Sequence, residues 1–146
     1  LQGNSEALTA DEVRGYELFK ANNCATCHVG ANLGGESYEL MGLRQHYFEA
    51  RGTELTEEDN GRYKQTQDER DRHRFKVPGL RNIELTWPYY HDGTRATMEE
   101  AVRDMALYQC DVELDDAEVA SIVAFLRTLT GEYQGQKLTS DNKQEN

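Results

Sequence analysis

The chain has 146 residues, close to the usual size of one domain. Its 27 acidic and 16 basic residues give a formal net charge of -11, which excludes a nucleic-acid-binding protein because such proteins need a basic face for the phosphates. Only 37% of the residues are hydrophobic, and no apolar run is long enough to predict a membrane span. The first residues are polar, so we expect that any export signal has already been removed.

Three segments predict helices. The first begins where Thr9 and Glu12 have the spacing of a capping box, and its apolar residues recur at helical spacing up to residues 22–23. The second begins at a similar box over residues 97–100. The third begins over residues 115–118 and has the strongest apolar stripe, which consists of Val119, Ile122, Val123, Leu126 and Leu129 and is followed by Gly131.

The rest of the chain shows no alternating apolar and polar run of useful length, so the expected fold class is all-α. We expect the first and last helices to pack on each other. Two segments, residues 29–38 and about 44–74, predict long irregular loops because they are rich in glycine or in charge. Aromatic side chains would anchor the second loop to the rest of the domain, namely Tyr47, Phe48 and Tyr63.

The chain ends are polar and predict segments without a packed core. We expect a flexible N-terminus over residues 1–8, one folded domain over residues 9–133, and a flexible polar tail over residues 134–146.

Residues 24–28 form a C-x-x-C-H string, which is the attachment motif of c-type haem. Cys24 and Cys27 are spaced to form two thioethers with one porphyrin, and the adjacent His28 would bind the iron as proximal ligand. A redox dithiol would want a βαβ pattern nearby, and a zinc site would want a second ligand pair, neither of which is present in the sequence. The sequence therefore predicts one covalent haem c. For Cys110 we expect a small buried apolar side chain rather than an intermolecular disulfide or a reactive thiol.

The sixth iron ligand decides between two kinds of function. A thioether ligand raises the reduction potential and suits an electron relay, whereas an open position suits peroxide binding. The candidates are water or a side chain from the set Met41, Met98, Met105, His46, His73 and His91. Met98 and Met105 would share one helix face, and the mid-helix position of Met105 gives it a modest preference.

Residues 75–93, FKVPGLRNIELTWPYYHDG, resemble a characteristic block of the bacterial dihaem cytochrome c peroxidases. The resemblance continues in register through residues 96–105, includes the C-x-x-C-H string and Asp59, and spans about residues 9–133. It is to the second, C-terminal domain of that family, which implies a cytochrome c-like domain with a high-potential, electron-transferring haem.

The resemblance also implies site residues. Met105 matches the family's axial methionine, so His28 and Met105 are implied as the axial pair, while Met98 is implied to fill the core. His91, which precedes Asp-Gly, would contact the haem edge or a propionate, or else simply occupy a turn. Arg81 and Lys76 would likewise pair with propionates or lie in solvent.

Backbone carbonyls at Thr86 and Pro88 match two calcium ligands of the family, but two ligands do not make a site, and the domain that supplies others is absent from this sequence. Calcium is therefore doubtful here. Trp87, Tyr89 and Tyr90 would face a partner domain or pack on the haem.

The leading hypothesis is a single-haem electron-transfer domain, either free-standing or half of a dihaem peroxidase, that receives electrons from a small donor cytochrome or copper protein. It would pass them on to a partner such as a peroxidatic haem domain. The acidic surface would favour a donor with a basic rim. One alternative is a peroxidase in its own right, with an open iron. Another is a subunit that assembles with a separate peroxidatic chain. Covalent haem attachment predicts the bacterial periplasm, and neither nucleic acid nor a membrane span is expected.

Overall fold

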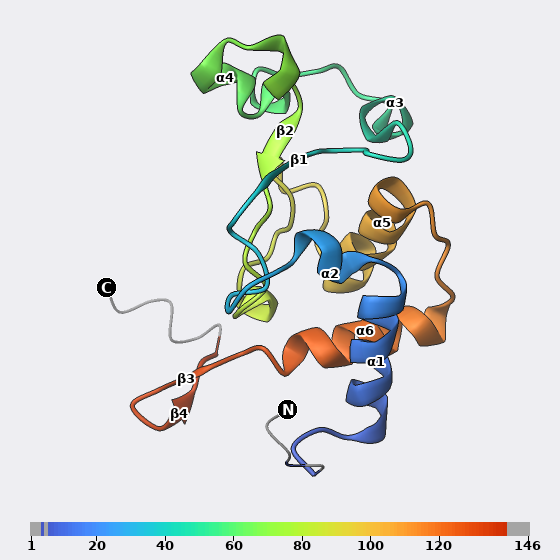
Figure 1. Cartoon of the computed structure of the whole chain (residues 1–146), viewed down its shortest axis with the longest axis vertical. Coiled ribbons are helices and arrows are strands. Elements are labelled where there is room, and N and C mark those ends of the chain that lie inside the picture. Colours follow the sequence, from blue (N-terminus) through green and yellow to red (C-terminus); the bar gives the residue numbers. More distant parts are fainter. Residues whose placement is uncertain (1–3, 5, 140–146) are drawn as a thin grey trace.

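The computed structural model describes residue 4 and residues 6–139 (Figure 1). The described part is mainly helical, which confirms the expected all-α class. Its helices, in chain order with the short 3-10 turns, are α1 (Ala10–Ala21), α2 (Cys24–Cys27), α3 (Tyr47–Arg51), η1 (Glu58–Asn60), α4 (Tyr63–Thr66), η2 (Glu69–Asp71), η3 (Ile83–Leu85), α5 (Met98–Cys110) and α6 (Asp116–Arg127). Among these residues no helix is long and apolar enough to cross a membrane.

The three longest helices begin where the sequence predicts. In each, the side chain of the residue before the helix accepts a hydrogen bond from the backbone N–H of the glutamate three residues later. The side chain of that glutamate accepts in turn from the backbone N–H of the residue before the helix. At α1, Thr9 Oγ1 accepts from the Glu12 N–H at 3.3 Å, and Glu12 Oε2 accepts from the Thr9 N–H at 2.7 Å. These boxes satisfy N–H groups that a helix end otherwise leaves without a partner.

The first and last helices pack on each other as expected, and a glycine allows their close approach. A Cβ at Gly15 would lie 1.8 Å from the carbonyl oxygen of Ser121, so only a residue without a side chain fits at this crossing. Tyr16 and Phe19 of α1 lie with ring centroids 5.3 and 5.5 Å from that of Phe125 on α6. The helix that directly precedes the thiol motif is thereby held on the core.

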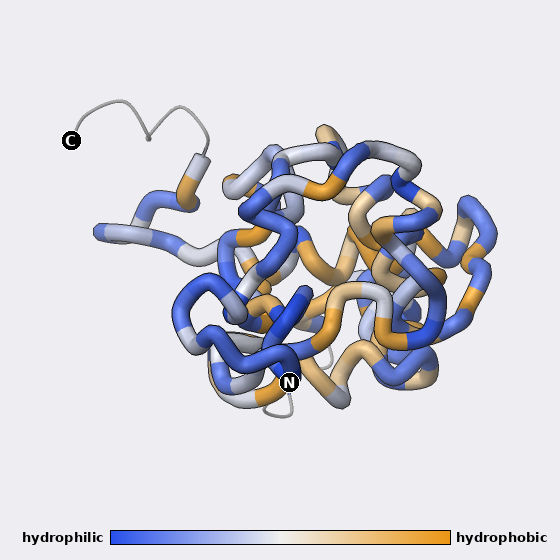
Figure 2. The backbone as a smooth tube through the Cα atoms, turned by 90° about the horizontal axis from the view of Figure 1, so that it is seen from above, coloured by the Kyte–Doolittle hydropathy of each residue, from blue (hydrophilic) through white to orange (hydrophobic). Residues whose placement is uncertain are grey.

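The core is small for a chain of this length. Its buried cluster lies mostly along α6 and consists of Phe19, Leu80, Tyr89, Met98, Val119, Ile122, Val123, Phe125 and Leu126. The prediction that Met98 fills the core is confirmed, since the residue is 6% exposed. Figure 2 shows hydrophobic residues in short stretches between longer hydrophilic ones.

The segment expected as one long loop is partly ordered by a short sheet. Strand β1 (Tyr38–Leu40) pairs antiparallel with β2 (Arg74–Lys76), and α3, α4 and the turns η1 and η2 lie between them in the sequence. Strands of three residues are too short to show an alternating pattern, so the sequence did not predict them.

Aromatic packing anchors this segment to the rest of the domain at Tyr47 but not at Tyr63. Tyr47 is 1% exposed, and its ring makes edge-on contacts with Tyr90 and Tyr108. Tyr63, by contrast, lies beneath the Arg72 guanidinium at 3.9 Å, within the same segment. Tyr47 therefore joins the segment to α5, whereas Tyr63 stabilises it internally.

Residues 132–137, at the start of the expected tail, form a hairpin of β3 (Glu132–Tyr133) and β4 (Gln136–Lys137). Figure 1 shows this hairpin projecting beyond the end of α6. The remaining parts of the expected flexible ends, residues 1–3, 5 and 140–146, lie outside the described residues.

Candidate haem site and the adjoining charge network

The thiol motif occupies a single helical turn directly after α1. Asn23 has a positive φ of 63°, a conformation that asparagine tolerates better than most residues, and so separates α1 from α2. Within α2 the His28 N–H donates to the Cys24 carbonyl at 3.0 Å. Cys24, Cys27 and His28 are all partly exposed on this one turn. Local backbone structure alone therefore groups two thiols and an imidazole.

Backbone carbonyls of Leu33 and Pro78 act on the His28 ring, and Nδ1 is the nitrogen at hydrogen-bond distance from Leu33. This Nδ1 lies 3.1 Å from the carbonyl oxygen of Leu33, and because a carbonyl only accepts, Nδ1 carries the proton. Burial lowers the pKa of His28, which favours the neutral imidazole. The lone pair is then on Nε2, as a metal-binding histidine requires.

The loop that supplies the Leu33 carbonyl is itself fixed to the following segment. A Cβ at Gly34 would lie 2.0 Å from the Pro78 carbonyl oxygen, and φ at this glycine is 135°. The Gly35 N–H donates to the Val77 carbonyl at 2.8 Å, and the Leu80 N–H donates to the Asn32 carbonyl at 2.9 Å. The orientation of His28 is thus set by a contact across the fold.

The structure distinguishes the three methionines. Met98 is packed in the core, and the sulfur of Met41 accepts from Gln109 Nε2 at 3.7 Å. Met105 lies two helical turns after Met98 on the same face of α5, outside the core cluster, and is half-buried. Of the three, Met105 has the thioether least committed to other protein groups.

The histidine candidates for the sixth position are placed differently. His73 Nδ1 lies 2.6 Å from the Asp59 backbone carbonyl, and His91 Nε2 lies 2.7 Å from the Asp59 carboxylate. His46 is exposed at the start of α3. Two of the three imidazoles therefore each have a nitrogen bonded to the same residue.

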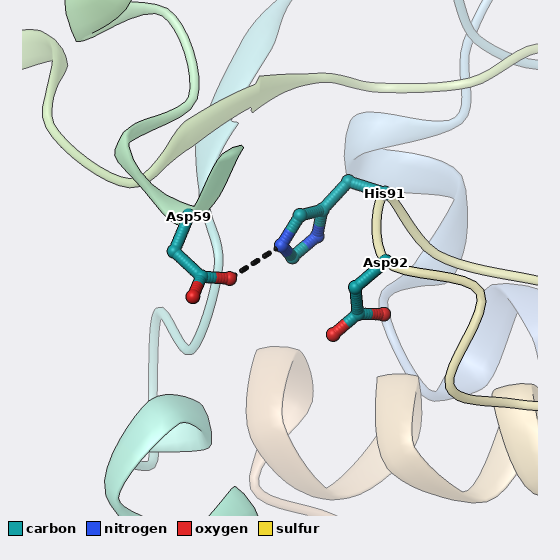
Figure 3. A group of neighbouring side chains, drawn as sticks. All are labelled: Asp59, His91 and Asp92. Atoms are coloured by element: carbon teal, nitrogen blue, oxygen red, sulfur yellow. Dashed lines mark hydrogen bonds and ion pairs between the residues drawn. The ribbon is translucent and has the colours of Figure 1, made fainter. Parts of the chain in front are cut away.

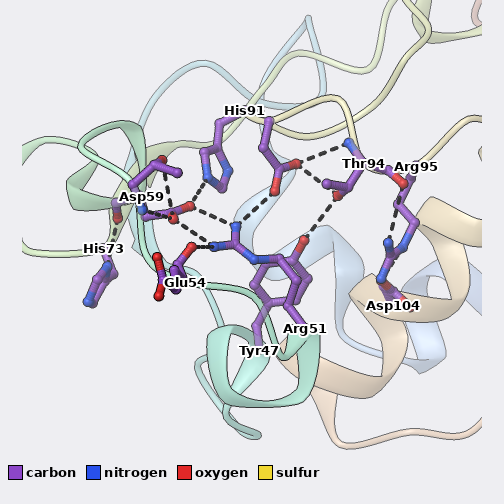
Figure 4. A network of polar contacts seen from close by, with 11 residues as sticks. Tyr47, Arg51, Glu54, Asp59, His73, His91, Thr94, Arg95 and Asp104 are labelled. Carbon is purple, nitrogen blue, oxygen red and sulfur yellow. Dashed lines mark hydrogen bonds and ion pairs between the residues drawn. The ribbon is translucent and has the colours of Figure 1, made fainter.

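A buried charge network surrounds Asp59 (Figures 3 and 4). Arg51 donates from Nη1 to Asp59 Oδ1 at 2.8 Å and from Nη2 to Oδ2 at 2.7 Å, and Nη1 also reaches Asp92 Oδ2 at 2.9 Å. The Thr56 N–H donates to Asp59 at 2.7 Å, and the His91 ring stacks on Phe75 with centroids 4.2 Å apart. The network joins α3, η1 and the turn at residues 91–94.

Arg51 dominates the electrostatics of this group. Its hydrogen bonds hold the pKa of Asp59 well below the usual range for a carboxyl and raise the pKa of the guanidinium. Asp59, His91 and Asp92 have potential ligand atoms within 4.8 Å of one another, but the guanidinium already donates to both carboxylates. The positive charge that a metal would supply is thus provided by Arg51, a residue that the sequence reasoning missed.

The remaining predicted site residues are exposed or belong to the charge network. Arg81 and Lys76 are exposed, and Thr86, Trp87 and Pro88 form an exposed stretch in which Trp87 is 59% accessible. His91 lies within the network rather than in an isolated turn. The structure thus shows His91 bonded to Asp59, and it leaves the expected haem contacts of His91, Arg81 and Lys76 as predictions.

Cys110 corrects one expectation. It is half-buried at the end of α5 and not fully buried. The influence of the Cys24 thiol lowers the pKa of Cys110 to about 7, and that of Cys110 raises the pKa of Cys24.

Residues 12–130 match the family model of cytochrome c, and the chain belongs to this family. Membership agrees with the donor set above and establishes a covalently bound haem c as the cofactor, held on a domain of cytochrome c fold. The two thiols and the imidazole with its lone pair on Nε2 fit that group chemically.

More specific relatives are peroxidases. The chain is 48% identical over 138 residues to cytochrome c551 peroxidase of Nitrosomonas europaea, covering 94% of this chain and 40% of that protein. It is 49% identical over 133 residues to cytochrome c peroxidase Ccp of Escherichia coli, covering 91% of this chain and 28% of that one. A crystal structure of a MauG-like protein associated with microbial copper homeostasis superposes with a TM-score of 0.68 at 27% identity, over 88% of this chain and 45% of that one.

The chain thus spans less than half the length of these relatives. It is a cytochrome c domain homologous to part of the cytochrome c peroxidases, and electron transfer by its haem is consistent with that relationship.

Proposed function

We propose that this chain is the electron-transferring haem domain of a peroxidase-like protein, with His28 and Met105 as the axial ligands and with Cys24 and Cys27 as the thioether residues. The observation that supports the His28 assignment is the contact of its Nδ1 with the Leu33 carbonyl, which places the lone pair on Nε2. A bound haem c supplies an iron that alternates between the ferric and ferrous states, and a thioether ligand raises its reduction potential.

The protein residues set the properties of such a relay. The Leu33 carbonyl orients the His28 ring and increases its basicity by accepting from Nδ1. Met105 is on a helix of 13 residues that a capping box stabilises, so its thioether is presented from a rigid element. The half-buried state of Met105 and of the motif cysteines leaves them free to pack against a large apolar group.

Peroxide reduction would take place in a second haem domain, as the resemblance to longer peroxidases suggests. Trp87, exposed in the stretch of residues 86–88, supports a partner domain at this surface. Calcium bound by the backbone carbonyls of Thr86 and Pro88 would need further ligands from that partner. The net charge of -11 suits a small donor cytochrome or copper protein with a basic rim, in the bacterial periplasm.

The axial assignment is tested by matched leucine substitutions, which preserve side-chain volume. The oxidised holoprotein is expected to show the weak far-red band of a thioether–iron bond. Met105→Leu should abolish the band and lower the reduction potential, whereas the control Met98→Leu, in the core, should retain both. The proposal would be contradicted if the far-red band survived in Met105→Leu, or if the wild-type protein gave a high-spin spectrum.

A further inference from the structure

The two halves of α5 are attached to the rest of the protein in different ways. In the first half, Met98 is part of the core cluster, and Ala101 and Val102 pack against that cluster. The last turn is joined by hydrogen bonds to residues 40–45, which continue from β1. Met105 lies between these two attachments along the helix, so its position depends on both.

Gln109 makes the central contacts between the last turn of α5 and the 40–45 segment. Its Oε1 accepts from the Leu43 N–H at 2.8 Å, and its Nε2 donates to the Leu40 carbonyl at 3.1 Å. The same Nε2 lies 3.7 Å from the sulfur of Met41. One amide side chain therefore satisfies a backbone donor and a backbone acceptor of the segment, which neither an apolar side chain nor a carboxylate can do.

Neighbouring groups add further hydrogen bonds between the same two elements. The Tyr108 carbonyl accepts from the N–H groups of Arg44 at 2.9 Å and Gln45 at 3.2 Å. The side-chain amide of Gln45 donates in turn to the carboxylate of Asp111, the residue that follows the helix. The end of α5 is thus held by several bonds that cooperate, with Gln109 in the middle of them.

The 40–45 segment is itself firmly placed. The Met41 N–H donates to the His73 carbonyl at 2.9 Å, one residue beyond the β1–β2 pairing, and the Met41 side chain is buried. Gly42 permits the tight turn that follows, because its φ is 83° and a Cβ there would lie 2.6 Å from the Gln45 carbonyl oxygen. The segment therefore connects the end of α5 to the loop region that carries the charge network.

Gln109 and Met105 share one side of α5. They are four residues apart, so Gln109 lies one turn beyond Met105 on the same helix face, and both side chains are half-buried. The face that presents the Met105 thioether is therefore the face that the 40–45 segment holds in place.

We propose that Gln109 is a positioning residue for the axial methionine: it holds the 40–45 segment against the last turn of α5 and thereby keeps the Met105 thioether on the iron. The proposal rests on the axial assignment made above. When the Gln109 contacts are broken, the last turn is released from the segment, and Met105 yields the sixth position to a small ligand more readily.

The first test measures carbon monoxide binding to the reduced holoprotein, because this ligand binds the ferrous iron when the thioether gives way. Gln109→Leu removes both hydrogen bonds with little change in side-chain length, and Gln65→Leu makes the same chemical change at an exposed position on α4. We expect binding to Gln109→Leu to be at least about tenfold faster than to the wild-type protein, and binding to Gln65→Leu to be within about twofold of it. Equal rates for Gln109→Leu and the wild-type protein would overturn the proposal.

Gln109→Glu tests the hydrogen bonds separately from side-chain packing. A carboxylate retains the acceptor for the Leu43 N–H but cannot donate to the Leu40 carbonyl, whereas a protonated carboxyl can do both. We expect the carbon monoxide rate of Gln109→Glu to approach that of Gln109→Leu at about pH 8 and that of the wild-type protein at about pH 4. A rate that depends on pH no more than the wild-type rate does would contradict the proposal.

Amide hydrogen exchange of the holoprotein distinguishes release of this junction from a general loss of stability. In Gln109→Leu, the N–H groups of Leu43 and Arg44 should exchange at least about tenfold faster, while those of α6 keep their wild-type rates. Equal acceleration in α6 would mean that the whole domain is destabilised and would refute the positioning role.

The outcomes also separate this proposal from the axial assignment on which it rests. If Met105→Leu loses the far-red band while Gln109→Leu leaves carbon monoxide binding and exchange unchanged, the positioning role alone is wrong. If Met105→Leu retains the band, the axial assignment is wrong, and the role of Gln109 as a positioning residue for Met105 fails with it.

Discussion

The buried pair of Arg51 and Asp59 should be among the largest single contributions to the stability of the loop segment. The Asp59 side chain is 1% exposed and that of Arg51 is 7% exposed. Replacing Asp59 by alanine leaves the guanidinium with Asp92, at 2.9 Å, as its remaining carboxylate partner. Removing one partner of a buried ion pair costs about 3–5 kcal/mol, and the retained Asp92 contact places the expected loss near the lower value, about 3 kcal/mol.

This loss is measurable by urea and thermal unfolding of the holoprotein, each followed by circular dichroism. At about 2–4 °C per kcal/mol for a domain of this size, Asp59→Ala should lower Tm by about 6–12 °C. A double-mutant cycle with Arg51→Met gives the pairwise term, because the methionine retains apolar packing without charge. We expect the double variant to be less destabilised than the sum of the single variants by about 2 kcal/mol.

Two results would refute this reasoning. A cost below about 1 kcal/mol for Asp59→Ala would mean that solvent or a local rearrangement compensates the arginine. Strict additivity in the cycle would mean that the stabilisation comes from the other partners of Asp59, such as the Thr56 N–H at 2.7 Å, and not from the ion pair.

Two further predictions concern the helix crossing and acid stability. Gly15→Ala should destabilise the protein by at least about 1 kcal/mol, because its Cβ would lie 1.8 Å from the Ser121 carbonyl oxygen. The exposed control Glu17→Ala should change the free energy of unfolding by less than about 0.5 kcal/mol. Equal effects of the two substitutions in thermal melts would contradict the crossing geometry. Because the folded pKa of Asp59 lies below its unfolded value, its stabilisation is complete above about pH 4 and is lost progressively as the pH falls. Urea titrations across this range should show a smaller acid loss in Asp59→Ala than in the unchanged protein, and identical losses would show that other carboxyl groups cause it.

The helices were the most predictable part of the fold because their signals are local. The capping boxes at residues 9–12, 97–100 and 115–118 each use two residues three positions apart, and all three occur in the structure. The β1–β2 pair joins residues 38–40 to residues 74–76, and neither three-residue strand carries a periodic pattern of its own. Its formation depends on the partner strand, which no local window contains.

The charge network illustrates the same limit at the level of single residues. Nothing in the sequence around Arg51 distinguishes it from other arginines of a charge-rich segment. Its importance arises because Asp59, eight residues later, and Asp92, far along the chain, converge on its guanidinium. Burial of that group then makes the pairing energetically significant.

The sequence by itself determined the cofactor and the helix starts, because each depends on residues that are neighbours along the chain. The spacing of residues 24–28 places two thiols and an imidazole on one turn in any fold that forms that turn. Only the tertiary structure decided that the Leu33 carbonyl lies against His28 Nδ1 and that Met98 is in the core cluster while Met105 is not. These contacts depend on how α1, α5 and the loops pack together, and that packing is set by burial of the whole core rather than by any one segment.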